Sequence, residues 1–446
     1  MDALRITGGQ RLHGTVAAGG SKNATLPIMA AAMLCDGPVV LSGTPQLTDV
    51  CTLAELLRHL GVESHRDADG DVYLDTIDPT PTTAPAALVR RMRASFCVLG
   101  PLLARRGRAV VPLPGGCNIG HRPVDLHLAG LAALGAELRI DRGFVIAEAR
   151  QLFGAKLNLR GPNGSTVTGT ANVLSAAVLA RGTTIITGAA TEPEIVDLGR
   201  FLIAAGANIE GLGTDTLEIH GVERLSGAEH EVIPDRIEAA TLLLAAAITR
   251  GTVSVTHVRP EHLSAVLEAL SAAGALVAVG NHKITVHAEN RPQPIDLIAR
   301  PYPGVPTDLQ AQFMALLALA EGNSVVADDV FPERSLHLAE LARLGARIQR
   351  RDRLAMVEGV HRLSGAEVTA TDLRATAALV LAGLAARGET IIHEVEHLER
   401  GYEDLPLKLN QLGANITRLT AKPAVAPPAG SRPSRQAREP ATPITT

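Results

Sequence analysis

The chain has few aromatic residues and no tryptophan. Aromatic residues make up 2% of its 446 residues, whereas 46% of all residues are hydrophobic. The core therefore has to be packed from Ala, Val, Leu and Ile. The formal net charge is −4, and no basic run is interleaved with aromatic rings, so the sequence does not indicate a basic surface that would bind nucleic acid. We expect a compact, Ala-rich globular protein that does not bind nucleic acid.

Paired cysteines and long apolar segments are also missing. The four cysteines (Cys35, Cys51, Cys97 and Cys117) show neither Cys-x-x-Cys spacing nor a nearby pair of histidines, which argues against a zinc site or a disulfide framework. The longest apolar run, near residues 26–35, is about half a membrane span, and the N-terminus lacks a leader-like pattern. We expect free thiols, no bound metal, no membrane partner and a cytoplasmic location.

A unit of roughly 70 residues is repeated six times along the sequence. Its first marker is an Ala-rich helix that ends near a glycine and leads into a β-branched strand. Its second marker is another helix that ends at a glycine before a strand. The first-marker glycines are Gly37, Gly107, Gly182, Gly251, Gly322 and Gly388, and the second-marker glycines are Gly61, Gly135, Gly206, Gly274, Gly345 and Gly413. Two markers in the same order six times favour related units over ordinary helix and strand alternation.

The length of the chain suits two domains of about 200 residues, each with three units. The first helix of each unit is apolar on nearly every side, as in TLLLAAAI, and is therefore predicted to be buried beneath outer sheets. We expect an α/β fold of two similar domains, each of three βαβαββ-type units with buried parallel helices. The predicted boundaries are 22–229 for the first domain, 1–21 plus 230–420 for the second, and 421–446 for a disordered tail.

Charged residues stand at the starts of several apolar helices, among them Lys22, Arg93 and Arg374. If equivalent helices run the same way, their N-termini converge and form an anion site. A cation at a helix N-terminus disfavours the helix by roughly a few tenths of a kcal/mol to 1 kcal/mol, so these residues suggest a ligand. Ordinary capping and solvation of the helix ends is the alternative explanation.

Cys117 lies in the segment PGGCNIGHRPVDLH, whose glycines and prolines are typical of a mobile loop. An arginine, here Arg122, and a helix start close to a thiol lower its pKa and make it reactive. A hairpin with an incidental cysteine is the alternative. A loop of this kind can carry a thiol into a cleft.

With these motifs, the chain resembles the UDP-N-acetylglucosamine enolpyruvyl transferases of the EPSP synthase superfamily. The resemblance runs from Ile6 to about Leu419 and is carried by GGSKNATLPIMAAAML, LPGGCNIGHRPVDLHLAGLAALGA, TVTGTANVLSAAVLARGTTII, VIPDRIEAAT and TDLRATAALVLAG. It implies an inside-out α/β barrel with substrates bound between two domains. The implied reaction transfers the enolpyruvyl group of phosphoenolpyruvate to the 3-hydroxyl of UDP-N-acetylglucosamine and releases phosphate, the first committed step of peptidoglycan synthesis. No cofactor and no obligate protein partner are implied.

The resemblance also implies roles for individual residues. Cys117 matches a general acid that fosfomycin alkylates, and Asp308 matches the residue beside the attacking hydroxyl. The implied contacts are Lys22, Arg122 and Arg400 for the phosphate; Arg334 and Arg374 for the carboxylate; and Asn23, Arg93, Pro123, Val124, Asp125, Leu126, Thr168, Gly169 and Val330 for the nucleotide sugar. Phosphoenolpyruvate carries two acidic groups, and the planar fork of arginine suits both.

The sequence differs from the usual family pattern more in segments implied to bind the acceptor than in segments implied to bind phosphoenolpyruvate. His121 precedes the loop arginine where a small residue is common, and Ala171 stands where Glu is frequent. Two alternatives therefore stay open. One is an enolpyruvyl transferase that acts on another nucleotide, such as UMP in nucleoside-antibiotic biosynthesis. The other is an inactive protein that binds a nucleotide sugar.

Overall fold

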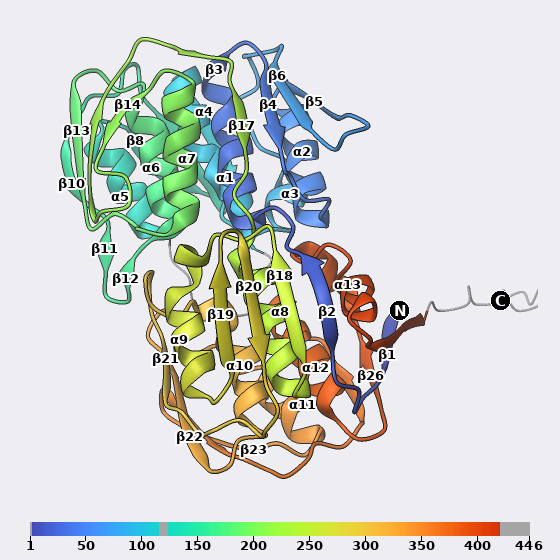
Figure 1. Cartoon of the computed structure of the whole chain (residues 1–446). Coiled ribbons are helices and arrows are strands. Elements are labelled where there is room, and N and C mark those ends of the chain that lie inside the picture. The colour runs from blue at the N-terminus through green and yellow to red at the C-terminus, as the bar shows by residue number, and fades with distance from the viewer. Residues whose placement is uncertain (1, 116–123, 420–446) are drawn as a thin grey trace, which may run out of the picture.

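The computed structural model describes residues 2–115 and 124–419. Two lobes of similar build are stacked, and strands β1 (Ala3–Thr7) and β2 (His13–Ala17) from the N-terminus belong to the lobe formed by the C-terminal half (Figure 1). Buried apolar side chains form two clusters, which we call the first core (within residues 24–233) and the second core (within 4–18 and 237–416). We propose that each core marks one domain. The predicted disordered tail, 421–446, lies outside the described residues.

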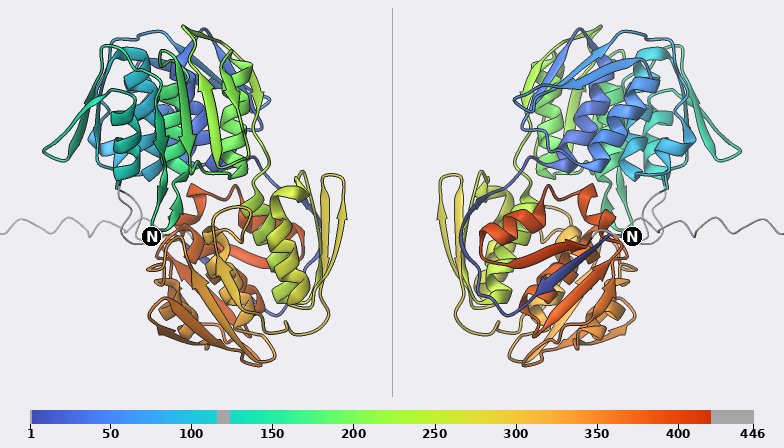
Figure 2. Two further views of the ribbon diagram at one scale, coloured as in Figure 1. Left: turned by 90° about the vertical axis from the view of Figure 1, so that its left-hand side faces the viewer. Right: turned by 90° about the vertical axis from the view of Figure 1, so that its right-hand side faces the viewer.

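Apolar helices occupy the middle of each lobe, as predicted. They are α1 (Lys22–Ala31), α4 (Leu99–Arg106) and α6 (Val167–Ala177) in the first core, and α8 (Arg236–Thr249), α10 (Gln310–Leu317) and α12 (Leu373–Ala385) in the second. All 14 residues of α8 are buried, because an all-round apolar surface has to be covered on every side. Within each lobe the helices lie inside and the sheets outside (Figure 2).

A second helix follows in every unit and confirms the second marker. These helices are α2 (Thr48–His59), α5 (Asp125–Ala133), α7 (Pro193–Ala204), α9 (Ser264–Ala272), α11 (His337–Arg343) and α13 (Leu405–Gln411), and short helix α3 (Ala86–Val89) lies between α2 and α4. Each of the six ends two residues before its marker glycine, which has a φ between +79° and +108°. Glycine adopts this left-handed conformation without steric cost.

The first marker fits a helix C-cap at Gly107 alone of its six glycines, since Gly107 directly follows α4 with φ +69°. Gly37, Gly182, Gly322 and Gly388 also have positive φ, but they lie three to six residues beyond the ends of α1, α6, α10 and α12. Gly251 was expected to end α8, but Arg250 takes the left-handed conformation there, with φ +56°. Gly251 is needed for a different reason, because a Cβ atom at this position would lie 2.0 Å from the carbonyl oxygen of Leu12. The glycine therefore allows the segment before β2 to approach the end of α8 closely.

Six sheets of three or four strands cover the helices within the described residues. Their orders are β17-β4-β6-β5, β7-β9-β8 and β10-β13-β15-β14 around the first core, and β19-β20-β18-β2, β21-β22-β24-β23 and β25-β26-β1-β27 around the second, with pairs β16-β3 and β11-β12 in addition. In the first lobe the strands are β3 (Cys35–Asp36), β4 (Val39–Ser42), β5 (Val62–Arg66), β6 (Val72–Thr76), β7 (Arg108–Pro112), β8 (Glu137–Asp141), β9 (Phe144–Glu148), β10 (Lys156–Asn158), β11 (Arg160–Gly161), β12 (Gly164–Ser165), β13 (Thr183–Thr187), β14 (Asn208–Glu210), β15 (Thr216–His220), β16 (Leu225–Ser226) and β17 (Glu229–Glu231). The second lobe adds β18 (Thr252–Thr256), β19 (Leu276–Gly280), β20 (Lys283–His287), β21 (Leu297–Ala299), β22 (Asn323–Asp328), β23 (Arg347–Arg351), β24 (Leu354–Glu358), β25 (Glu367–Thr369), β26 (Glu389–His393) and β27 (Asn415–Leu419) to β1 and β2.

Two chain segments connect the lobes, and they run side by side. The backbone N–H of Ser21 donates to the carbonyl of Ile233 at 2.7 Å, and the N–H of Asp235 donates to the carbonyl of Gly19 at 2.8 Å. This double connection sets the starts of α1 and α8 next to each other. No helix among the described residues is both long and apolar enough to span a membrane.

Candidate active site

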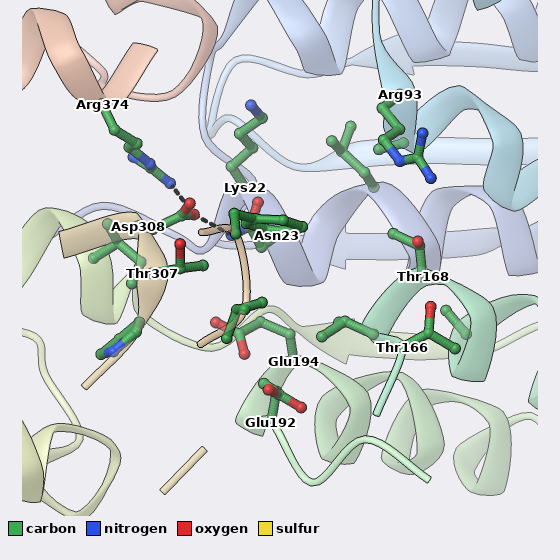
Figure 3. A pocket seen from close by; sticks show the side chains of 18 of the residues that line it. Lys22, Asn23, Arg93, Thr166, Thr168, Glu192, Glu194, Thr307, Asp308 and Arg374 are labelled. Carbon is green, nitrogen blue, oxygen red and sulfur yellow. Dashed lines mark hydrogen bonds and ion pairs between the residues drawn. The ribbon is translucent and has the colours of Figure 1, made fainter. Parts of the chain in front are cut away.

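A cavity of about 690 Å³ lies where the two cores face each other (Figure 3). The starts of the buried helices supply much of its wall: Lys22 from α1, Thr168 from α6, Arg236 from α8 and Arg374 from α12. Short 3-10 helices at the starts of α4 and α10 add Arg93 and Asp308. The convergence of helix starts expected from the sequence is therefore confirmed.

Most residues proposed for the site line this cavity. They are Lys22, Asn23, Arg93, Asp125, Leu126, Thr168, Asp308, Val330, Arg334, Arg374 and Arg400. Val124 and Gly169 are not part of the wall, since Val124 belongs to the first core and the N–H of Gly169 donates to the hydroxyl of Thr166 at 3.2 Å. Cys117, Arg122 and Pro123 lie outside the described residues.

The start of α1 is held so that Lys22 and Asn23 face the cavity. The hydroxyl of Ser21 caps the helix by accepting from the N–H of Ala24 at 3.3 Å. The N–H of Lys22 donates to the carboxylate of Asp235 at 3.3 Å. These bonds satisfy N–H groups that a helix start leaves without partners, and they fix Lys22 and Asn23 as its first residues.

Asp49 joins two cations that come from different lobes. Its carboxylate lies 2.7 Å from Nζ of Lys22 and 2.9 Å from Nε of Arg400, and its side chain is 4% exposed. Burial lowers the pKa of Lys22 below its ordinary value, the Asp49 carboxylate opposes this shift, and Arg374 and Arg400 add to it. Asp49 therefore favours the charged form of Lys22 inside the cavity.

Asp308 likewise joins two arginines. Its carboxylate lies 2.9 Å from a terminal nitrogen of Arg374 and 3.1 Å from one of Arg334, and it accepts from the amide of Asn23 at 3.4 Å (Figure 3). Burial by itself would raise the pKa of Asp308, but the guanidinium groups of Arg374 and Arg334 outweigh it and hold the pKa far below its usual range. In this arrangement Asp308 is ionised and a weak base.

A second buried ion pair links the lobes on another side of the cavity. Arg236 of α8 donates through Nε and a terminal nitrogen to the two carboxylate oxygens of Glu194 at 2.9 and 3.1 Å. The guanidinium also lies 5.6 Å from the centre of the Tyr302 ring. Burial raises the pKa of the neighbouring Glu192. This pairing orients the two lobes without using the cations around Asp49 and Asp308.

The arrangement suits a small ligand with two acidic groups. Lys22 and Arg400 around Asp49, and Arg334 and Arg374 around Asp308, give four cations within one cavity. Arginine binds carboxylate or phosphate through two parallel hydrogen bonds, and lysine adds a compact point charge. Among the described residues, no cluster of three or more His, Cys, Asp or Glu side chains could hold a metal ion.

A profile of the family described as EPSP synthase (3-phosphoshikimate 1-carboxyvinyltransferase) matches residues 6–409. The chain belongs to this family. Among curated EPSP-synthase-family relatives, the UDP-N-acetylglucosamine 1-carboxyvinyltransferase of Hydrogenovibrio crunogenus is 48% identical over 94% of this chain and 100% of its own length. The enzyme of the same name from Coxiella burnetii is 49% identical over 94% of this chain and 97% of its own. The resemblance inferred from the sequence is confirmed.

Solved structures of this family agree with the fold. The enolpyruvyl transferase NikO from Streptomyces tendae has a TM-score of 0.85 and 29% identity, and the match covers 94% of this chain and 99% of NikO. EPSP synthase from Acinetobacter baumannii has a TM-score of 0.73 at 20% identity over 94% of this chain and 100% of its own, a likeness that concerns the fold alone. The prediction of an EPSP-synthase-like inside-out barrel is confirmed.

Asp49 and Glu194 are site residues that the sequence reasoning missed. Asp49 stands in the first turn of α2, and Glu194 in the first turn of α7. Both carboxylates belong to the second helix of their units, whereas Lys22, Arg93 and Arg374 stand at the starts of the buried helices. Their one available signal was an acidic residue at a helix start, which ordinary stabilisation of the helix dipole also explains.

Proposed function

We propose that this protein transfers the enolpyruvyl group of phosphoenolpyruvate to the 3-hydroxyl of UDP-N-acetylglucosamine and releases phosphate. The observation that carries the proposal is the cluster of Lys22, Arg334, Arg374 and Arg400 between the two cores. An anion with a phosphate and a carboxylate matches these four cations. The names of the curated relatives support the nucleotide-sugar acceptor. Since phosphoenolpyruvate is an intermediate of central metabolism, we propose the cytoplasm as the compartment.

In this proposal each acidic group of phosphoenolpyruvate takes one pair of cations. The phosphate interacts with Lys22 and Arg400, together with Arg122. The carboxylate interacts with the guanidinium groups of Arg334 and Arg374. Because both arginines are paired with Asp308, the incoming carboxylate competes with Asp308 for them.

That competition provides a way to activate Asp308. Two guanidinium groups depress its pKa, so weaker pairing with them raises its basicity. Asp308 then accepts the proton of the sugar hydroxyl while the hydroxyl oxygen bonds to C2 of phosphoenolpyruvate. An acid, Cys117 in this proposal, delivers a proton to the C3 methylene. In the second step a proton leaves the new methyl group and the C2–O bond to phosphate breaks, which restores the double bond and releases phosphate.

Phosphate release with a panel of acceptors tests the function. The purified protein is incubated with phosphoenolpyruvate and one acceptor, either UDP-N-acetylglucosamine or UMP. Released phosphate is measured, and the products are identified by mass spectrometry. We expect phosphate and an enolpyruvyl adduct in equal amounts with UDP-N-acetylglucosamine. Turnover with UMP alone would favour the alternative acceptor, and tight binding of UDP-N-acetylglucosamine without phosphate release from any acceptor would favour an inactive binding protein.

Replacing Cys117 with Ser is expected to abolish covalent labelling by fosfomycin, because the hydroxyl is a far poorer nucleophile than a thiolate. Burial raises the pKa of the Cys35 and Cys97 thiols to about 12, so they compete poorly for the reagent. Intact-mass spectrometry measures the adduct. Cys51→Ser removes an exposed thiol and is the matched control that should still be labelled. Normal labelling of the Cys117→Ser variant would remove Cys117 from its proposed role.

A further inference from the structure

A chain of hydrogen bonds runs behind the cavity wall from Asn172 through His127 to Thr168. Asn172 is 0% exposed and His127 is 2% exposed, whereas Thr168 lines the cavity. The amide nitrogen of Asn172 lies 2.9 Å from Nδ1 of His127, and Nε2 of His127 lies 3.2 Å from the hydroxyl oxygen of Thr168. The chain therefore connects the first core to the surface that a ligand would touch.

The backbone determines which way the Asn172 amide points. Its oxygen accepts from the N–H of Gly100 at 2.8 Å, and its nitrogen donates to the carbonyl of Phe96 at 2.9 Å. An N–H can only donate and a carbonyl can only accept, so the amide has one possible orientation. Its second N–H hydrogen is left to donate to Nδ1 of His127.

The orientation of Asn172 fixes the tautomer of His127. Because Nδ1 accepts a hydrogen bond, the proton of the neutral ring sits on Nε2. Nε2–H then donates to the hydroxyl oxygen of Thr168. Within the described part of the chain that hydroxyl makes no other hydrogen bond, so its own hydrogen is available to a ligand oxygen in the cavity.

We propose that Asn172 and His127 are positioning residues that make the hydroxyl of Thr168 a hydrogen-bond donor toward an anionic oxygen of the diphosphate in the bound nucleotide sugar. This inference rests on the proposed function, because it takes the nucleotide sugar as the ligand. Thr168 lies on the side of the cavity where Arg93 also lies (Figure 3). A fixed donor at this position favours a ligand that places a hydrogen-bond acceptor beside Thr168 and disfavours a ligand that places a donor there.

Thr168→Val and Thr168→Ser test the hydroxyl with matched shapes. Valine keeps the size of the side chain but has no donor, so the Kd and KM for UDP-N-acetylglucosamine should rise about tenfold, or ~1.4 kcal/mol, with kcat and the KM for phosphoenolpyruvate little changed. Serine keeps the donor and should stay near the original values. An unchanged Kd in the valine variant would overturn the inference.

The role of His127 is tested separately. His127→Gln keeps an N–H that can reach Thr168 and should retain most of the affinity, whereas His127→Leu should weaken binding and add little to the loss caused by Thr168→Val. Nitrogen-15 NMR of the unaltered protein should show a proton on Nε2 and none on Nδ1 of His127. A proton on Nδ1 contradicts this inference alone. Failure of the unaltered protein to bind UDP-N-acetylglucosamine contradicts the proposed function, and with it the ligand named here.

Discussion

Asp308→Asn is expected to lower kcat by about 10²- to 10⁴-fold, the range that general acid–base catalysis contributes. Asparagine keeps the shape of the side chain, and its one amide oxygen can still accept a hydrogen bond from one of the two arginines, but it cannot take the proton of the acceptor hydroxyl. Binding of the nucleotide sugar should remain measurable. Phosphate release and calorimetric titration measure the two properties separately.

An exposed carboxylate outside the cavity provides the control for this variant. Asp215 is paired only weakly at the surface, 3.4 Å from Arg160, and Asp215→Asn should keep normal turnover. Asp308→Ala is a second test, because it removes hydrogen-bond acceptance as well as basicity. Turnover near the normal rate in both Asp308 variants would refute its assignment as the base.

Asp49→Asn is expected to lower kcat/KM for phosphoenolpyruvate by about 10- to 100-fold, because one substitution removes the charge that holds both Lys22 and Arg400. The effect should depend on pH. Burial, Arg374 and Arg400 all lower the pKa of Lys22, and Asp49 is the group that opposes them. Without its charge the pKa falls further, so Lys22 loses its proton at a lower pH.

The pH profile of kcat/KM is the measurement that separates this role from a loss of structure. The alkaline decline of the Asp49→Asn variant should begin at lower pH than that of the unaltered protein, since the profile reports groups of the free enzyme. Glu358→Gln, at an exposed pair with Arg347, is the matched control. A variant with lower activity but an unshifted alkaline limb would mean that Asp49 does not control the charge of Lys22.

The repeated architecture could be predicted because its signals are local. A helix that is apolar all round has to be buried, and a helix that turns directly into a strand favours glycine where φ is positive, as at Gly61 and Gly413. Gly251 shows the limit of this reasoning. Its glycine is required by the approach of Leu12, which is distant in sequence, and nothing local distinguishes that cause from a helix end.

The members of the site could be predicted better than their pairing. Charged residues at buried helix starts indicated Lys22, Arg93 and Arg374, because the repeat brings those starts together. Their partners depend on how the two lobes face each other, as for Asp49 with Arg400. The low pKa of Asp308 likewise comes from arginines 26 and 66 positions away in the sequence. Cys117, Arg122 and Pro123 stay predictions from the loop sequence.

A crystal structure of the Asp308→Asn variant with phosphoenolpyruvate and UDP-N-acetylglucosamine tests the central claim most directly. We expect phosphate oxygens at hydrogen-bond distance, about 3 Å, from Lys22 and Arg400. The carboxylate should lie between Arg334 and Arg374, with the sugar hydroxyl beside position 308. Phosphoenolpyruvate bound elsewhere, with both arginines still paired to that side chain, would contradict the account.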